Sequence, residues 1–211
     1  MVDGRKPHLN IAGALTRAQK LVARHQRFLL GLTGPPGTGK STLSARLQRQ
    51  LGDACAVVPM DGYHLSTAEL DRRGLRHVKG RPETFDAHGF VSALQRIRTE
   101  DATVYVPQFD RALEQPISGA IGVPPGEVLV LVEGNYLLLD IQPWGEVKPL
   151  LDEVWYCDLP GPQRLQRLVQ RHVHHGRSAR EAVEWANRVD QANADLIEAS
   201  RLRADFVIDM D

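Results

Sequence analysis

The residues from Gly34 to Ser41 have the types and the spacing of a loop that binds phosphate. Their order, Gly-Pro-Pro-Gly-Thr-Gly-Lys-Ser, matches the pattern Gly-x-x-x-x-Gly-Lys-Ser/Thr at every required position. In this pattern backbone N–H groups surround the phosphates, the lysine reaches the β- and γ-phosphates, and the hydroxyl holds Mg²⁺. The sequence therefore predicts that Lys40 and Ser41 bind the phosphates and the metal ion of a nucleoside triphosphate.

The backbone of this loop must supply most of the anion-binding groups. Pro35 and Pro36 have no N–H, so the donors must come from Gly37 through Ser41, with the positive end of a following helix behind them. The predicted nucleotide-binding set is Gly34, Gly37, Thr38, Gly39, Lys40, Ser41 and Thr42. A Gly/Pro-rich turn with a chance Lys-Ser pair is the alternative.

The segments on either side have the patterns that would position the loop. Residues 28–32 form an apolar run typical of a buried strand, and residues 40–51 carry leucines at a spacing of four, as a helix would. A strand, a loop and a helix therefore follow one another in the required order.

Carboxylates follow other predicted strands and complete a candidate site. Residues 55–59 lead to Asp61, and residues 127–132 lead to Glu133. Because parallel strands present their carboxyl ends at one edge of a sheet, we expect both side chains, with Asp110, to face the crevice beside the loop. Glu133 has the position of a metal-assisting carboxylate, and Asp61 that of a general base toward an acceptor hydroxyl. Ordinary strand-terminal turns are the alternatives for both.

The rest of the chain alternates between helical and strand patterns. We expect helices at 9–25, 87–99, 161–172 and about 178–202, the last opened by a capping box at Ser178 and Glu181, and further strands at 103–107, 120–123, 154–157 and 206–208. The basic segment 66–86 contains breaker residues and fits a loop. This alternation predicts an α/β fold, a three-layer sandwich with a mostly parallel central sheet.

Length and composition limit the class of protein. The 211 residues, 42% of them hydrophobic, fit one domain spanning 1–211, and 26 basic against 26 acidic side chains favour neither nucleic acid nor an anionic membrane as partner. No apolar run has the length of a membrane span and no signal-peptide core follows the amino terminus, so we expect a cytoplasmic protein. Cys55 and Cys157 are expected to be reduced, without a disulfide or zinc. The sequence does not fix the oligomeric state, and a homodimer is one possibility.

Five blocks of the sequence resemble the superfamily of uridine kinase, phosphoribulokinase and bacterial pantothenate kinase. They are residues 34–41, 60–65, 79–86, 104–111 and 132–140, so the resemblance covers nearly all of the chain after residue 27. The Glu-Gly-Asn-Tyr and Phe-Asp-Arg blocks are most similar to bacterial proteins named as fructose transport system kinases or fructokinases.

This resemblance implies an ATP- and Mg²⁺-dependent kinase of the P-loop NTPase fold with an arginine-bearing helical lid at about 164–180. It implies that Asp61 is the base, that Glu133 assists Mg²⁺, and that Lys40 acts with lid residues Arg171 and Arg177 on the transferred phosphate. The acceptor pocket would contain Tyr63, His64, Arg81, Phe109, Asp110, Arg111 and Tyr136. Arg164 is expected to be solvated, and His172, His174 and His175 to be exposed lid residues rather than a metal cluster.

Departures from the uridine kinase pattern bear on the acceptor. Gly80 and Glu114 stand near positions where uridine kinases have an acid and a histidine. These departures make a nucleoside less favoured, and the resemblance implies a free sugar such as fructose, with pantothenate second and a nucleoside third. A regulatory NTPase without a small-molecule acceptor is the alternative class, although the chain has no Asn-Lys pair of the kind with which GTPases read guanine. A third alternative is an adaptor protein that only retains a nucleotide-binding site. The presence of both Asp61 and Glu133 argues against it, because such a protein would need neither carboxylate.

Overall fold

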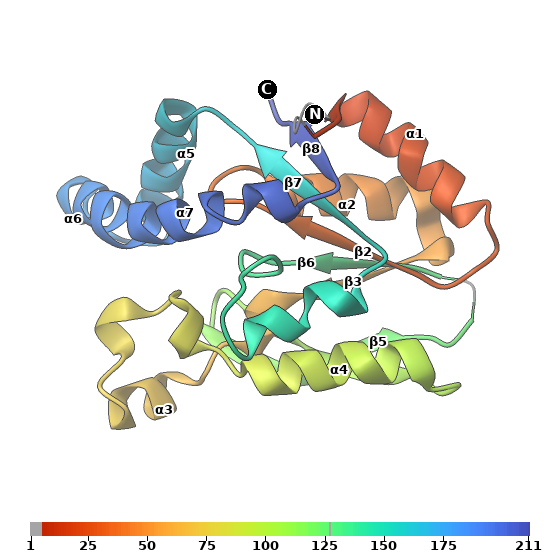
Figure 1. Cartoon of the computed structure of the whole chain (residues 1–211). Helices are drawn as coiled ribbons and strands as arrows, with labels where there is room; N and C mark the ends of the chain where they lie inside the picture. Colours follow the sequence, from red (N-terminus) through yellow and green to blue (C-terminus); the bar gives the residue numbers. More distant parts are fainter. Residues whose placement is uncertain (1–5, 127) are drawn as a thin grey trace.

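The computed structural model describes residues 6–126 and 128–211 and is built on a six-stranded parallel sheet (Figure 1). Its order is β1–β8–β7–β2–β6–β3. The strands are β1 (His8–Asn10), β2 (Phe28–Thr33), β3 (Cys55–Pro59), β6 (Leu129–Glu133), β7 (Glu153–Asp158) and β8 (Phe206–Asp209). The predicted parallel sheet is confirmed, while Glu127, placed at the start of one predicted strand, lies outside the described residues.

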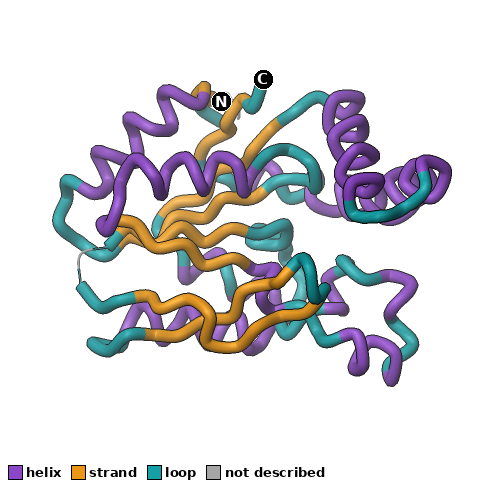
Figure 2. Tube along the Cα trace, turned by 180° about the vertical axis from the view of Figure 1, so that it is seen from behind, coloured by secondary structure: helices purple, strands orange, loops and turns teal. Residues whose placement is uncertain are grey.

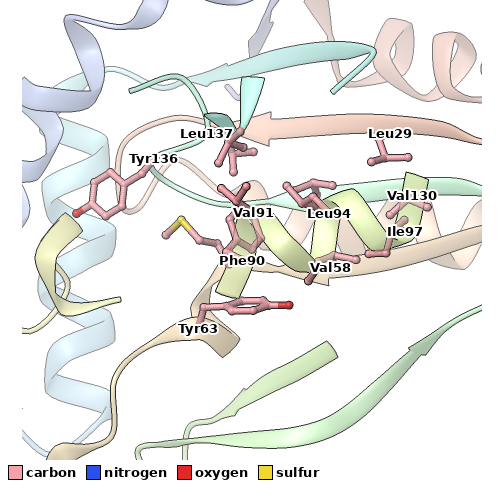
Figure 3. Packing of buried hydrophobic residues seen from close by; sticks show 14 of the residues in the cluster. Leu29, Val58, Tyr63, Phe90, Val91, Leu94, Ile97, Val130, Tyr136 and Leu137 are labelled. Carbon is pink, nitrogen blue, oxygen red and sulfur yellow. The ribbon is translucent and has the colours of Figure 1, made fainter. Parts of the chain in front are cut away.

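Helices cover both faces of the sheet and make the sandwich. Helices α1 (Ile11–Val22) and α2 (Lys40–Leu51) lie on one face, and α4 (Ala87–Thr99) lies on the other (Figures 1 and 2). Alternate residues of β6 serve the two sides: Leu131 packs in the cluster beneath α2, and Val130 packs in the cluster beneath α4 (Figure 3). Because successive strand residues point to opposite faces, a strand buried on both sides must be apolar throughout.

The strands predicted at 103–107 and 120–123 are present, but they do not belong to the central sheet. Strand β4 (Val104–Asp110) pairs antiparallel with β5 (Gln115–Val123) in a separate two-stranded hairpin. The connection between them is a short turn, in which Asp110 Oδ1 accepts the N–H groups of Ala112 (2.8 Å) and Leu113 (3.0 Å). A turn this short can join only antiparallel neighbours, because a parallel pair needs a crossover connection.

Several other elements differ from the prediction in their extent. Strand β1 includes residues 9 and 10, which are expected from the sequence to be helical. Asn10 ends the strand, and its side chain caps the first turn of α1. Segment 66–86 is more ordered than a loop and contains α3 (Thr67–Arg72) with short 3₁₀ turns. The capping box at Ser178 is confirmed, but its helix is divided into α6 (Ala179–Trp185), a π-helical turn (Ala186–Asp190) and α7 (Gln191–Glu198).

Helix α5 (Gly161–His174), α6 and α7 project together from the sheet, above the segment that contains α3 (Figure 1). We call residues 161–198 the arm. Cys55 and Cys157 are free and buried within the sheet. Across the two described ranges, no helix is long and apolar enough to cross a membrane.

Candidate active site

The loop at residues 34–41, here called the phosphate loop, follows a path that only glycine can take at three points. Gly34, Gly37 and Gly39 have φ angles of 141°, 86° and 96°. A Cβ on Gly34 would lie 2.5 Å from the Cys157 carbonyl oxygen, and one on Gly37 would lie 2.9 Å from that of Arg164. Both the backbone angle and the close neighbours therefore require glycine, and the loop is clamped between β7 and α5.

Lys40 lies inside the loop and is 6% exposed. Its Nζ donates to the carbonyl oxygens of Gly34 at 2.7 Å and Pro35 at 3.0 Å, while the Thr38 hydroxyl donates to Pro35 at 3.0 Å. Burial lowers the pKa of Lys40, and the charges of Glu133 and Asp61 oppose that shift. The ammonium group is therefore held at the loop by its own backbone, beside two carboxylates.

Ser41 and Glu133 meet at the base of the loop. The Ser41 hydroxyl donates to Glu133 Oε1 at 2.9 Å, although their positions are 92 residues apart. Burial and the neighbouring Asp61 raise the pKa of Glu133, while Lys40 and the Ser41 hydrogen bond lower it. The hydroxyl oxygen of Ser41 and the carboxylate of Glu133 lie side by side and are suitable ligands for Mg²⁺, which is usually bound by one or two protein groups and by the phosphates of the substrate. Within the described ranges no group of three His, Cys, Asp or Glu side chains could hold a metal alone.

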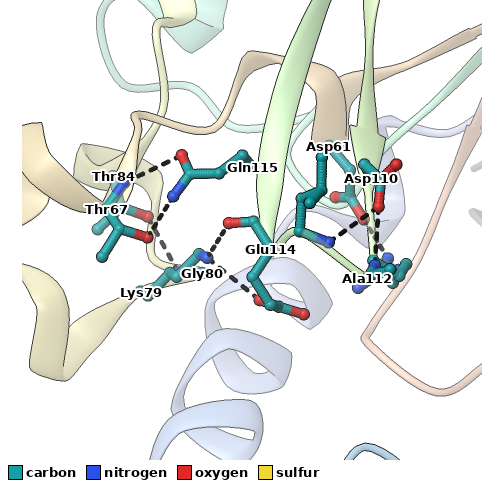
Figure 4. Close-up of polar contacts among 11 residues, drawn as sticks. Asp61, Thr67, Lys79, Gly80, Thr84, Asp110, Ala112, Glu114 and Gln115 are labelled. Carbon is teal, nitrogen blue, oxygen red and sulfur yellow. Dashed lines mark hydrogen bonds and ion pairs between the residues drawn. The ribbon is translucent and has the colours of Figure 1, made fainter.

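A cavity of about 1490 Å³ opens in front of the phosphate loop. The loop and the end of β6 contribute one side, the arm contributes a second, and residues 61–85 with the hairpin turn 109–114 contribute a third, which we call the hairpin wall. Figure 4 shows part of this wall, where Lys79 Nζ contacts the Glu114 carboxylate at 3.2 Å. The cavity thus joins segments separated by more than 100 residues.

Asp61 faces this cavity from the 3₁₀ turn (Met60–Tyr63) that follows β3. Its Oδ2 accepts a hydrogen bond from the Arg111 guanidinium at 2.7 Å. The hairpin lies against this turn, since a Cβ on Gly62 would be 2.2 Å from the Pro107 carbonyl oxygen. That close approach at Gly62 places Arg111, at the hairpin tip, opposite the candidate base.

Aromatic rings of the hairpin wall are in contact with the protein's own side chains. Phe109 has Lys79 Nζ 5.0 Å and Arg111 Cζ 5.4 Å from its centroid. His64 stacks on Phe85 with centroids 3.9 Å apart. The Nδ1 atom of His64 is buried without a hydrogen-bond partner, and burial lowers the pKa of this ring to about 4. His64 is therefore neutral at physiological pH.

Some predicted pocket residues lie outside the cavity lining. Tyr63 packs edge-on against Phe90 in the core, and Asp110 holds the hairpin turn. Tyr136 is fully buried and donates its hydroxyl to the Gly80 carbonyl oxygen, while Arg81 lines a separate cavity of about 690 Å³. The structure therefore brings His64, Phe109 and Arg111 into the cavity with Asp61, but not these four.

Arg164 of the arm is buried, so the expectation that it is solvated is wrong. It is 4% exposed, and its guanidinium donates to the Pro36 carbonyl oxygen at 3.4 Å and to the Gln191 side chain. Helix α5 packs on the phosphate loop, which removes this face of the helix from water. Arg171 and Arg177 line the cavity together with Arg167.

The histidines of the arm differ from one another in burial. His174 and His175 are exposed, as expected. His172 is only 14% exposed at its side chain and bonds Asp190 Oδ2 at 2.7 Å, which contradicts the expectation for this residue. The π-helical turn brings Asp190 to α5, a contact that no spacing in the sequence indicates.

Lys79 and Asn193 are cavity residues that sequence reasoning did not select. Lys79 begins one of the recognised blocks, so a signal for it existed. Asn193 is 4% exposed and its Nδ2 donates to the Gly80 carbonyl oxygen at 3.3 Å, which ties the arm to the hairpin wall. No motif contains Asn193, so only the fold could reveal it.

Several known proteins are similar to this chain in sequence. No model of a protein family matches the chain. A Schizosaccharomyces pombe protein named "Putative uridine kinase C227.14" is 36% identical over 204 residues, which are 91% of this chain and 87% of that protein. The uncharacterized protein YggC of Escherichia coli is 33% identical over 210 residues, which are 97% and 85% of the two chains.

A solved structure is similar over the same extent. The crystal structure of a "putative fructose transport system kinase" from Silicibacter sp. TM1040 superposes with a TM-score of 0.84 at 39% identity, covering 94% of this chain and 98% of that one. The similarity therefore includes the phosphate loop, the hairpin wall and the arm together.

Proposed function

The chain belongs to the uridine kinase-like family of P-loop kinases, and we propose that its acceptor is a small metabolite of the sugar class, such as fructose. Its fold is the α/β P-loop NTPase fold, and it is an ATP-dependent phosphotransferase with a hydroxyl group as acceptor. The proposal concerns the acceptor, the metal and the roles of individual residues.

The state of Phe109 is the observation that carries the sugar proposal. Proteins commonly hold an unpaired nucleobase by stacking it on an aromatic side chain. On the hairpin wall, Phe109 already contacts Lys79 and Arg111, and Phe85 is stacked by His64. A base would have to displace these side chains, whereas the hydroxyl groups of a sugar could bond the polar groups that they present. A nucleoside is the second candidate, because one relative carries the name of a uridine kinase.

In the proposed reaction Asp61 acts as the general base. Its carboxylate takes the proton of the acceptor hydroxyl while that oxygen forms a bond to the γ-phosphorus, and the bond from that phosphorus to the β–γ bridging oxygen breaks to release ADP. Lys40 would stabilise the charge on the transferring oxygens. Ser41 and Glu133 would hold Mg²⁺, which neutralises phosphate charge when bound.

The arm supplies the remaining positive charge in this proposal. Arg171 and Arg177 face the cavity from the predicted lid region, residues 164–180, and their planar guanidinium groups can bond two phosphate oxygens each. The Arg177 guanidinium lies 3.9 Å from the centroid of the Trp185 ring, which holds it on the arm. Because the reaction uses ATP and small metabolites, we propose a cytoplasmic location and no nucleic-acid or membrane partner.

An acceptor panel with product identification tests the proposal. Purified protein with ATP and Mg²⁺ is incubated with fructose, other sugars, sugar derivatives, pantothenate, uridine and cytidine, and products are identified by mass spectrometry. We expect a phosphorylated sugar or sugar derivative as the dominant product. Phosphorylated uridine or cytidine as the dominant product would overturn the sugar proposal, and ADP release that no acceptor changes would favour a bare NTPase.

A further inference from the structure

We propose that Lys79 and Arg111 form a subsite for an anionic group of the acceptor. The preferred acceptor would then be a polyhydroxyl compound that also carries a carboxylate or a phosphate monoester, rather than a neutral sugar. The inference rests on the proposed function, because it names a substrate class for the same cavity. It assigns these two side chains to the recognition of a charged group of the acceptor other than the hydroxyl that reacts.

Both cations converge on one aromatic ring from different parts of the chain. Lys79 comes from the segment after α3, and Arg111 comes from the hairpin tip, yet each lies within 5.4 Å of the Phe109 centroid. Both line the cavity with Asp61. The Lys79 side chain is 20% exposed, so it is packed into the wall rather than extended into solvent. The ring fixes two positive charges at one place on the hairpin wall.

The side chains that line the cavity carry a net positive charge, although the chain as a whole is neutral. Seven cationic and four acidic side chains line it, in a protein whose formal net charge is zero. The phosphate loop and the arm supply Lys40, Arg167, Arg171 and Arg177 for a nucleotide. The charges of Lys79 and Arg111 lie on the opposite wall, where both lower the pKa of His64 after the larger effect of burial. A second anion would complement them.

The partners of these cations also point to an exchangeable anion. Lys79 contacts Glu114, which is 57% exposed, and Arg111 contacts Asp61, which is 38% exposed. Exposed ion pairs of this kind contribute little free energy, so a bound anion can replace them. The Arg111 guanidinium occupies one of the acceptor positions of Asp61 Oδ2. An acceptor whose anionic group binds Arg111 would release that position on the candidate base.

A binding experiment tests the subsite without knowledge of the acceptor. The full chain is saturated with Mg²⁺ and a non-hydrolysable ATP analogue and titrated calorimetrically with inorganic phosphate. We expect Lys79→Met and Arg111→Met each to weaken phosphate binding by roughly 10- to 100-fold without changing the affinity for the analogue. Arg72→Gln is the matched control, because Arg72 is an exposed cation of α3 that pairs with Glu69 and does not line the cavity.

A second measurement compares acceptors. Initial rates are measured for fructose, its 1- and 6-phosphates, gluconate and pantothenate, which separate phosphate from carboxylate recognition. We expect kcat/KM to be at least about 10-fold higher for one anionic compound than for fructose, and the preference to disappear in both variants. Unchanged phosphate binding in both variants, phosphate binding lost only together with the ATP analogue, or a preference for fructose itself would overturn the subsite. The last result would leave the proposed function standing. If no compound is phosphorylated, the proposed function fails and the phosphate titration alone decides the subsite.

Discussion

The phosphate loop and the hairpin wall face each other across one cavity but present different groups to it. The loop is built from backbone: Gly34 and Gly37 lie against carbonyl groups, and Lys40 is buried with its Nζ on the carbonyl oxygens of Gly34 and Pro35. The wall presents side-chain ion pairs, Asp61 with Arg111 and Lys79 with Glu114. These wall pairs are partly exposed, whereas Lys40 is enclosed.

This difference corresponds to the two substrates: the phosphate loop would bind ATP, and the hairpin wall would bind the acceptor. A kinase that uses ATP binds the same triphosphate whatever its acceptor is, so one rigid backbone cradle can serve any acceptor. Side chains on a hairpin can change without altering the central sheet, so the wall can be adapted to one acceptor. We therefore expect substitutions in the loop to affect the use of ATP with every acceptor, and substitutions in the wall to affect transfer to the acceptor while ATP binding changes little.

Replacement of the candidate base should have the largest effect and would separate the two regions most clearly. Asp61→Asn keeps the size of the side chain but removes the proton acceptor, so transfer should fall roughly 10²- to 10⁴-fold. The affinity for ATP should change little, because the phosphate loop is untouched. Turnover with the best acceptor and calorimetric ATP binding measure the two effects. Loss of ATP binding in this variant would mean that Asp61 serves the nucleotide or its metal.

Removal of the buried lysine should have the next largest effect. Lys40→Ala deletes a preorganised cation, and turnover should fall on the order of 10²- to 10³-fold, about 3 to 4 kcal/mol. The fall should be the same for every acceptor, in contrast to wall substitutions. Steady-state kinetics with two acceptors check this, with Lys20→Ala on the exposed face of α1 as control. Near wild-type turnover would contradict the role of the loop.

The neutral histidine of the wall predicts a smaller, pH-dependent effect on stability. The pKa of His64 is about 4 in the folded protein and 6.5 in an unfolded reference, so the unfolded chain takes up the proton first. Stability is therefore complete above about pH 6.5 and is lost as the pH falls toward 4. Between pH 7.5 and 5 this loss should be about 2 kcal/mol.

The variant His64→Gln isolates that contribution, because it keeps a polar side chain that does not titrate. Urea unfolding at both pH values should show a smaller loss of stability for the variant than for the wild type. Equal losses in the two proteins would mean that folding does not lower the pKa of His64, so that the ring takes up its proton at pH 5 as readily in the folded protein as in the unfolded chain.

The amino-acid sequence by itself determined the phosphate loop and the strands of the central sheet other than β1. The loop could be predicted from Gly34 to Ser41 because each of its functions depends on residue type at a fixed short spacing, and the buried strands because a strand covered on both faces must be apolar throughout. Asp61 and Glu133 followed from the same rule, since strand ends of a parallel sheet converge.

Only the tertiary structure decided how the hairpin wall and the arm are arranged. The strand pattern of β4 is the same in a hairpin as in a central sheet, so nothing local showed that Asp110 caps a turn while Arg111 reaches Asp61. Arg164 and His172 have the residue types of a solvated helix, and α5 buries them because the phosphate loop and the π-helical turn pack against it. Contacts between segments 18 to more than 100 residues apart leave no periodic trace in either segment, because side-chain periodicity records which face is buried and not what covers it.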